Sequence, residues 1–235
     1  MLTVEAIDVY IKSSLILHEV SLKLEKGEVV CLVGRNGAGK TTTLRTIMGY
    51  LRPQKGKILF LGKDITRLST YEIGRLGIGF APEDSGIFPD LTAQENIEIS
   101  TWNRKTSRSE EERINVAYEL FPVLKNYAKR KGTQMSGGER KILSIARALA
   151  LDAELFLLDE PFEGLAPAII TQIAESIRRI TTMGPSIFIS ESNIYHVPDF
   201  AERLYVIERG EIIFSGKPEE VADQKETLRI IAGVA

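Results

Sequence analysis

The alternation of apolar and polar positions divides the chain into a β-rich front and a helical middle. Residues 3–33 have the pattern of short alternating strands, with a turn at Glu25–Gly27, and residues 56–62 predict another strand pair. From about Leu91 to Ala150 the apolar spacing becomes helical, and the charged run 109–113 has the features of a helix start. The pattern therefore predicts a β region followed by a helical region.

The last third of the chain returns to short apolar runs. Leu155–Leu158 and Ile187–Ile189 are continuous and apolar, as expected of buried parallel strands, and Val29–Val33 near the front is similar. Between the two later runs, Pro167–Ile180 has helical spacing. No internal repeat or low-complexity linker interrupts the pattern. We therefore expect an α/β core into which the helical stretch is inserted.

Composition narrows the class of protein. With 235 residues, 43% hydrophobic and 26% charged, the chain suits one large globular domain or two small lobes. A net charge of −2 gives no electrostatic reason to expect nucleic-acid binding. The apolar runs are too short to cross a membrane, and the single cysteine, Cys31, lies in one of them. These features predict a cytoplasmic protein with a buried thiol, which can still dock onto a membrane partner.

The most specific motif is a glycine-rich loop at residues 34–42, which lies between a predicted strand and a predicted helix. Glycines allow such a loop to curl so that its backbone N–H groups point inward, and the helix adds its positive end. Lys40 is expected to neutralise the β- and γ-phosphates of a nucleotide, and the Thr41 hydroxyl to bind Mg²⁺. The predicted nucleotide-binding residues are Gly34, Arg35, Asn36, Gly37, Ala38, Gly39, Lys40, Thr41 and Thr42.

A second candidate phosphate site precedes another helical segment. Ser136 is a good N-cap, and Gly137 and Gly138 permit close backbone approach to an anion at the helix start. By itself this motif is explained as well by an ordinary capped helix after a loop. Asp159 and Glu160 follow a short apolar run, where the plain alternative is a strand end with solvated carboxylates.

Together, in this order and spacing, these motifs resemble the ATP-binding-cassette (ABC) ATPases over essentially the whole chain. The resemblance implies a P-loop cassette with a mixed β-sheet core, an antiparallel β subdomain and an inserted α-helical subdomain. It implies that residues 1–83 and 152–235 form the core and residues 84–151 the helical signature subdomain. It also implies that Asp159 helps to hold Mg²⁺ and that Glu160 is the general base for the attacking water.

The resemblance further implies how ATP and its partners are bound. Tyr10 lies where the family places a ring that stacks on adenine, although a core tyrosine is nearly as plausible. Ser136, Gly137 and Gly138 would close over ATP held by a second cassette in a head-to-tail dimer, and Glu163–Ala166 would link the two sites. That second cassette can be identical or a paralogue, and we favour a heterodimer. The implied cofactors are ATP and Mg²⁺.

Two positions depart from the broad family pattern. Glu83 stands where most members carry glutamine, and it can still accept hydrogen bonds and ligate Mg²⁺. Ser192 stands where most carry a histidine that contacts the γ-phosphate, and a serine should stabilise the developing charge less. His196 is expected to be a surface residue rather than a substitute, and His18 a structural one. Pro82–Glu83, together with Gly-Leu-Ala-Pro at 164–167, resembles the branched-chain amino-acid importers.

The expected function is ATP hydrolysis that energises an importer of branched-chain or other hydrophobic amino acids, at the inner face of the cell membrane. Separate permease subunits would dock near Phe88, Leu91 and Thr92, with a substrate-binding protein acting indirectly. Importers of urea or short amides, and lipopolysaccharide exporters, are alternatives. A regulator that binds nucleotide with little hydrolysis is another, because Ser192 replaces the histidine. A soluble ABC ATPase of DNA repair or translation fits less well, since this compact cassette lacks long insertions.

Overall fold

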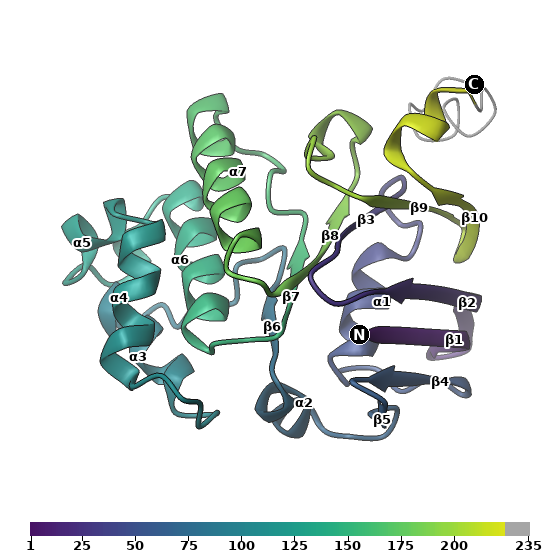
Figure 1. Ribbon diagram of the computed structural model, residues 1–235, viewed down its shortest axis with the longest axis horizontal. Coiled ribbons are helices and arrows are strands. Elements are labelled where there is room, and N and C mark those ends of the chain that lie inside the picture. The colour runs from purple at the N-terminus through teal and green to yellow at the C-terminus, as the bar shows by residue number, and fades with distance from the viewer. Residues whose placement is uncertain (224–235) are drawn as a thin grey trace. The chain divides into compact units, whose positions relative to one another are not determined.

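The computed structural model describes residues 1–223 (Figure 1). Contacts divide the chain into two compact units. The first comprises Met1–Ile73 and the chain from Ser186 onward, and the second comprises Gly74–Pro185. The two units are described in turn.

The first unit contains an antiparallel sheet with the strand order β2-β1-β4-β5 (Figure 1). Its strands are β1 (Leu2–Ile11), β2 (Ser14–Leu24), β4 (Lys55–Phe60) and β5 (Lys63–Asp64). The alternating pattern of residues 3–33 therefore predicts strands correctly. At residues 56–62 the structure has β4 and a turn, because Leu61 and Gly62 both take positive φ.

A second group of strands in the same unit runs mostly parallel. Strand β3 (Val29–Val33) lies between β8 (Ser186–Glu191) and β9 (Arg203–Glu208), parallel to both, and β10 (Glu211–Gly216) pairs antiparallel with β9. All five residues of β3 are buried, which explains its unbroken apolar sequence. Helix α1 (Lys40–Ile47) follows this central strand. The mixed β sheet predicted for the core is thus confirmed.

The second unit combines two parallel strands with a group of helices (Figure 1). Strand β6 (Ile78–Ala81) pairs with β7 (Leu155–Asp159), as the apolar run at 155–158 predicts. This unit also contains the helices α3 (Ala93–Thr101), α4 (Glu110–Leu120), α5 (Val123–Tyr127), α6 (Gly137–Ala150) and α7 (Pro167–Thr181). Helix α6 contacts α3, α4, β6 and β7 and so forms the centre of this unit. Elsewhere within residues 1–223, the helical segments are α2 (Thr70–Leu76) and 3₁₀ turns at Gly132–Gln134, Ile194–His196 and Pro218–Asp223.

Three helices of the second unit begin with the same reciprocal cap. The side chains of Thr92, Ser109 and Ser136 each accept a hydrogen bond from the backbone N–H three residues later. The glutamate at that later position bonds back to the N–H of the cap residue. These glutamates are Glu95, Glu112 and Glu139. Each cap is worth about 1 kcal/mol of helix stability, and the helix start predicted at residues 109–113 is one of them.

The predicted division into a core of residues 1–83 and 152–235 and a helical subdomain of residues 84–151 stays a prediction. The compact units are defined by contacts, and they group β6, β7 and α7 with the helices. Within residues 1–223, no helix has both the length and the apolar character required to cross a membrane.

Candidate active site

The glycine-rich loop connects the buried end of β3 to the start of α1. Gly37 has φ 84° and Gly39 has φ 118°, a region that residues with side chains avoid. A Cβ atom on Gly39 would also lie 2.7 Å from Cδ2 of Leu17, whereas one on Gly37 would meet nothing within 4 Å. Gly39 is therefore required both by its conformation and by close packing, and Gly37 by its conformation alone.

Backbone hydrogen bonds to other segments of the first unit hold the glycine-rich loop in place. The Gly34 N–H donates to the Glu191 carbonyl at the end of β8 (3.2 Å), and the Ala38 carbonyl accepts from the Gly210 N–H (2.8 Å). A Cβ atom at Gly34 would come within 2.3 Å of the Ile207 carbonyl oxygen. Only glycine therefore allows the backbone of the loop to lie this close to β9. Contacts within the protein thus fix the shape of the loop, which reduces the entropic cost of binding.

The start of α1 offers donors suited to a polyphosphate. Its N-cap is Gly39, which supplies no side-chain hydrogen bond to the first helical N–H groups. Lys40 is buried, and its Nζ donates to the carbonyl oxygens of Gly34 (2.8 Å) and Arg35 (3.2 Å). Phosphate oxygens can replace these neutral acceptors and gain a charge-assisted hydrogen bond. Thr41 lies half-buried in the first turn, where its hydroxyl suits a metal that bridges the phosphates.

Tyr10 lies on a hairpin that contacts the same loop. It pairs with Leu15 across β1 and β2, and Leu17 further along β2 is the residue packed against Gly39. The Tyr10 side chain is 39% exposed, so it is not a core tyrosine. An exposed ring at the edge of the loop can stack on a base. Its adenine-binding role stays a prediction.

The acidic pair of the second unit lies in a buried strand end. All five residues of β7 are buried, including Asp159, and Glu160 directly after it is only 5% exposed. The alternative of solvated carboxylates is therefore wrong. Glu160 has φ 47°, a left-handed conformation that costs a residue with a side chain about 1–2 kcal/mol. Such strain is concentrated at functional sites, which supports the catalytic assignment of Glu160.

Glu83 and Asp159 are linked by a lysine that the sequence interpretation missed. Lys141 of α6 is 5% exposed, and its Nζ donates to the carbonyl oxygens of Glu83 (2.7 Å) and Asp159 (3.4 Å). The Glu83 side chain itself is exposed. The signal was present in the sequence, because Lys141 is a cation on the apolar face of an amphipathic helix.

The second phosphate motif forms the N-terminus of α6 on the surface of the second unit. Ser136 is exposed and caps the helix, its Oγ accepting from the Glu139 N–H at 3.3 Å. Around Gly137 a Cβ atom would meet nothing within 4 Å, and at Gly138 it would lie 3.5 Å from Ile169. Gly137 is therefore exposed with free space beside it, as binding of an anion held by another molecule would require.

Ser192 and His196 follow β8 in the first unit. Ser192 is half-buried and directly follows Glu191, the residue whose carbonyl holds Gly34 of the loop. The His196 Nδ1 lies 3.2 Å from the Glu191 carboxylate, and that carboxylate is completely buried. The His196 side chain is 27% exposed, which is an intermediate exposure, and its interpretation as a surface residue rather than a substitute for the histidine stays a prediction.

Comparison with known proteins identifies the family. Residues 17–163 match the family described as ABC transporter. The chain belongs to this family. It is 35% identical to the lipopolysaccharide export system ATP-binding protein LptB of Haemophilus influenzae, over 99% of this chain and 97% of that protein. It is 39% identical to the high-affinity branched-chain amino acid transport ATP-binding protein BraG of Pseudomonas aeruginosa, over 91% of each.

Solved structures agree with this membership. A nucleotide-free ATP-binding cassette from an ABC transporter superposes with a TM-score of 0.84 at 27% identity, covering 98% of each chain. The cassette MJ0796, in a dimeric post-hydrolysis state bound to ADP and Pi, superposes with a TM-score of 0.81 at 27% identity. The match covers 93% of the present chain and 99% of the MJ0796 chain.

The family assignment confirms the predicted fold, the ATPase activity and the cofactors ATP and Mg²⁺. It also confirms the predicted partners, a second cassette and transmembrane permease subunits, and the placement of the chain as a peripheral subunit at the membrane. The residues of the chain fit ATP and Mg²⁺, since the glycine-rich loop, Lys40 and Thr41 supply phosphate and metal donors in one unit. The buried acids Asp159 and Glu160 lie in the other.

Proposed function

We propose that this ABC ATPase energises the import of branched-chain or other hydrophobic amino acids. Two features support this cargo: the 39% identity to BraG, and the Pro82–Glu83 and Gly-Leu-Ala-Pro sequences that resemble that subfamily. The similarity to LptB favours a second candidate, lipopolysaccharide export, and it extends over 99% of the chain. The catalytic part of the proposal depends on one observation, the buried and strained Glu160 at the end of β7.

Each site residue has a defined task in this proposal. The loop N–H groups and Lys40 hold the phosphates, and Tyr10 stacks on the adenine. Thr41, Asp159 and Glu83 would hold Mg²⁺, which when bound offsets the negative charge of the phosphates. Glu160 accepts a hydrogen bond from the attacking water and orients it.

Further contacts complete the site in the same proposal. Ser192 contacts the γ-phosphate through its hydroxyl. Ser136, Gly137 and Gly138 bind the ATP of the partner cassette. No covalent intermediate is needed, because phosphoryl transfer depends on positioning and charge stabilisation.

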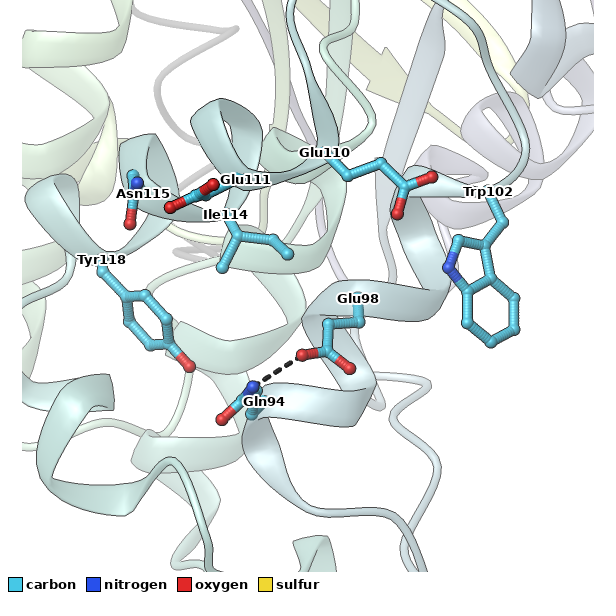
Figure 2. A pocket seen from close by; sticks show the side chains of 8 residues that line it. All are labelled: Gln94, Glu98, Trp102, Glu110, Glu111, Ile114, Asn115 and Tyr118. Carbon is cyan, nitrogen blue, oxygen red and sulfur yellow. Dashed lines mark hydrogen bonds between the residues drawn. The ribbon is translucent and has the colours of Figure 1, made fainter.

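A groove between α3 and α4 is the surface we assign to the permease (Figure 2). Its volume is about 630 Å³. Three carboxylates and the indole of Trp102, which is 68% exposed, favour a cationic side chain on a helix of the permease. The lining residues are Gln94, Glu98, Trp102, Glu110, Glu111, Ile114, Asn115 and Tyr118.

The residues predicted to receive the permease lie in the segment just before α3, a helix that lines this groove. Phe88 is 44% exposed, and Asn96 of α3 holds its backbone through both the N–H and the carbonyl. Leu91 and Thr92 directly precede α3, and Thr92 is its N-cap. A permease helix seated on α3 would therefore contact the segment that begins near Glu83.

The ATPase assignment is tested with Glu160→Gln in the chain assembled with its permease. Glutamine keeps the shape of glutamate but is a far weaker acceptor for the water proton. We expect ATP binding to persist, hydrolysis to fall nearly to zero and a stable dimer to accumulate. Unchanged turnover would remove Glu160 from the role of base. Tight ATP binding without turnover in the unmodified assembly would instead favour a nucleotide-binding regulator.

Two further variants test the phosphate-contacting residues. Lys40→Ala should weaken nucleotide binding, and undiminished affinity would contradict the role of the loop. Ser192→His should leave hydrolysis intact or increase it if this position contacts the γ-phosphate. A large loss would mean that Ser192 is not equivalent to the histidine of other members.

The cargo is tested by stimulation of the ATPase in membrane vesicles that contain the cognate permease and binding protein. Leucine, isoleucine and valine should stimulate turnover. Stimulation by urea or short amides, or by lipopolysaccharide alone, would each replace the amino-acid assignment with the corresponding alternative.

The groove is tested with Glu98→Lys, which introduces repulsion toward a cationic helix. Association with the permease should weaken while ATP turnover of the isolated chain stays unchanged. The matched control is Glu175→Lys on the exposed part of α7. Equal effects of the two variants would contradict this docking surface.

A further inference from the structure

We propose that Lys141 is a positioning residue for hydrolysis, which sets the backbone at Glu83 and Asp159 so that their carboxylates can act on Mg²⁺ and its waters. This inference rests on the proposed roles of Glu83 and Asp159. In this proposal Lys141 does not touch the nucleotide. It acts through the Glu83 and Asp159 segments, to whose carbonyls it donates hydrogen bonds.

The burial of Lys141 is the first observation. Its side chain is 5% exposed, and removing an ammonium group from water costs several kcal/mol unless strong acceptors replace the water. Two of its acceptors are backbone carbonyls at functional segments, Glu83 O at 2.7 Å and Asp159 O at 3.4 Å. A lysine that served only to pack α6 could be replaced by an apolar residue of similar size without this cost.

The placement of Lys141 on α6 is the second observation. It follows the N-cap residue Ser136 by about one and a half turns of the same helix. A rigid helix of 14 residues therefore carries a phosphate-binding terminus and the ammonium that holds Glu83 and Asp159.

The segment after Glu83 is the third observation. Ser85 has φ 67° and Gly86 has φ 51°, so two consecutive residues are left-handed and Ser85 is under strain. Arg147, further along α6, donates to the Gly86 carbonyl, and its guanidinium lies 4.9 Å from the centre of the Phe88 ring. Helix α6 thus ties down both ends of the segment 83–88, with Lys141 at the end that carries the carboxylate.

The test compares Lys141→Met with Lys125→Met, which removes an exposed lysine from α5. Methionine keeps the length of the side chain and removes all its hydrogen-bond donors. Three quantities are measured on the full chain: steady-state hydrolysis over a range of Mg²⁺ concentrations, ADP affinity with and without Mg²⁺ by calorimetry, and thermal unfolding. The Mg²⁺-free ADP affinity reports on the phosphate loop, which lies outside the two segments that Lys141 bonds.

For Lys141→Met we expect Mg²⁺-free ADP affinity within about twofold of the original and a fall in kcat of about tenfold. The Mg²⁺ concentration for half-maximal activity should rise at least threefold, and Mg²⁺ should strengthen ADP binding less than in the original chain. Lys125→Met should change none of these values. A purely structural lysine would lower the melting temperature without shifting the Mg²⁺ dependence, and that result would overturn the proposal.

A second variant keeps the test decisive if Lys141→Met does not fold. Lys141→Arg retains the charge and donors but has a longer, planar head group. It should fold and still shift the Mg²⁺ dependence, and an unchanged dependence would overturn the proposal. The outcome is separable from that of the proposed function, because Glu160→Gln tests the latter alone. An inactive Glu160→Gln with an unperturbed Lys141→Met would refute only the positioning role.

Discussion

The backbone strain at Glu160 allows a prediction in which two equally inactive variants differ in stability. Glu160→Gly and Glu160→Ala both remove the carboxylate, so both should abolish hydrolysis. They differ in how easily they take the left-handed conformation at φ 47°. The comparison therefore isolates the backbone from every interaction of the glutamate side chain.

The magnitude follows from two opposing contributions. The left-handed conformation destabilises alanine by about 1–2 kcal/mol, whereas glycine adopts it without penalty. Glycine in turn loses about 0.4–1 kcal/mol more through the entropy of the unfolded chain. We therefore expect Glu160→Gly to be more stable than Glu160→Ala by about 0.5–1 kcal/mol, or a melting temperature higher by about 1–4 °C.

The measurement is urea unfolding of the nucleotide-free protein, since bound nucleotide would add its own stabilisation. The control pair is Glu175→Gly and Glu175→Ala on the exposed face of α7. There the order should reverse, with glycine less stable by about 1 kcal/mol because the residue is helical. Equal stability of the two variants at residue 160, or a more stable alanine, would refute the assignment of strain.

Three other predictions concern the first unit. Gly34→Ala should lower the free energy of unfolding by about 1–3 kcal/mol in urea, because its Cβ would lie 2.3 Å from the Ile207 carbonyl; an unperturbed variant would contradict this packing. Burial raises the pKa of the Cys31 thiol, so iodoacetamide at pH 8 should label it only after denaturation. A hydrogen bond to Glu211 raises the pKa of His18, so its NMR titration should lie above about 6.5, and Glu211→Gln should bring it back. The stability from this pair is present below the unfolded pKa and lost as pH rises through the raised one.

The sequence predicted those parts of the site that are local. The glycine-rich loop is defined by a strand, its glycines and a helix that follow one another directly, so residues 34–42 could be assigned without tertiary information. The caps at Ser109 and Ser136 were recognisable for the same reason. The cap at Thr92 has the same Thr-x-x-Glu pattern and could have been found.

The parts that were missed depend on residues distant in the chain. Lys141 lies far from Glu83 and Asp159 in sequence, and only the packing of α6 against β6 and β7 brings its ammonium to their carbonyls. The contact of the His196 imidazole with the buried carboxylate of Glu191 was likewise not predicted, because nothing in the sequence indicates that Glu191 is buried. The left-handed backbone at Glu160 has no sequence signal, since glycine is the residue expected there.

The three reciprocal helix caps make the second unit sensitive to acid. Backbone hydrogen bonds from Thr92 and Ser109 lower the pKa of Glu95 and Glu112. Burial opposes the shift at Glu139, but hydrogen bonds, first among them that from the Ser136 backbone, outweigh it and the pKa again falls.

Carboxylates with lowered pKa stabilise the fold above their unfolded pKa, near pH 4, and lose that contribution as pH falls through the folded value. As these glutamates take up protons, helices α3, α4 and α6 would each lose the part of the cap that the carboxylate supplies. As pH falls below about 4, the starts of these three helices should therefore loosen, and amide exchange there should accelerate before it does in β3.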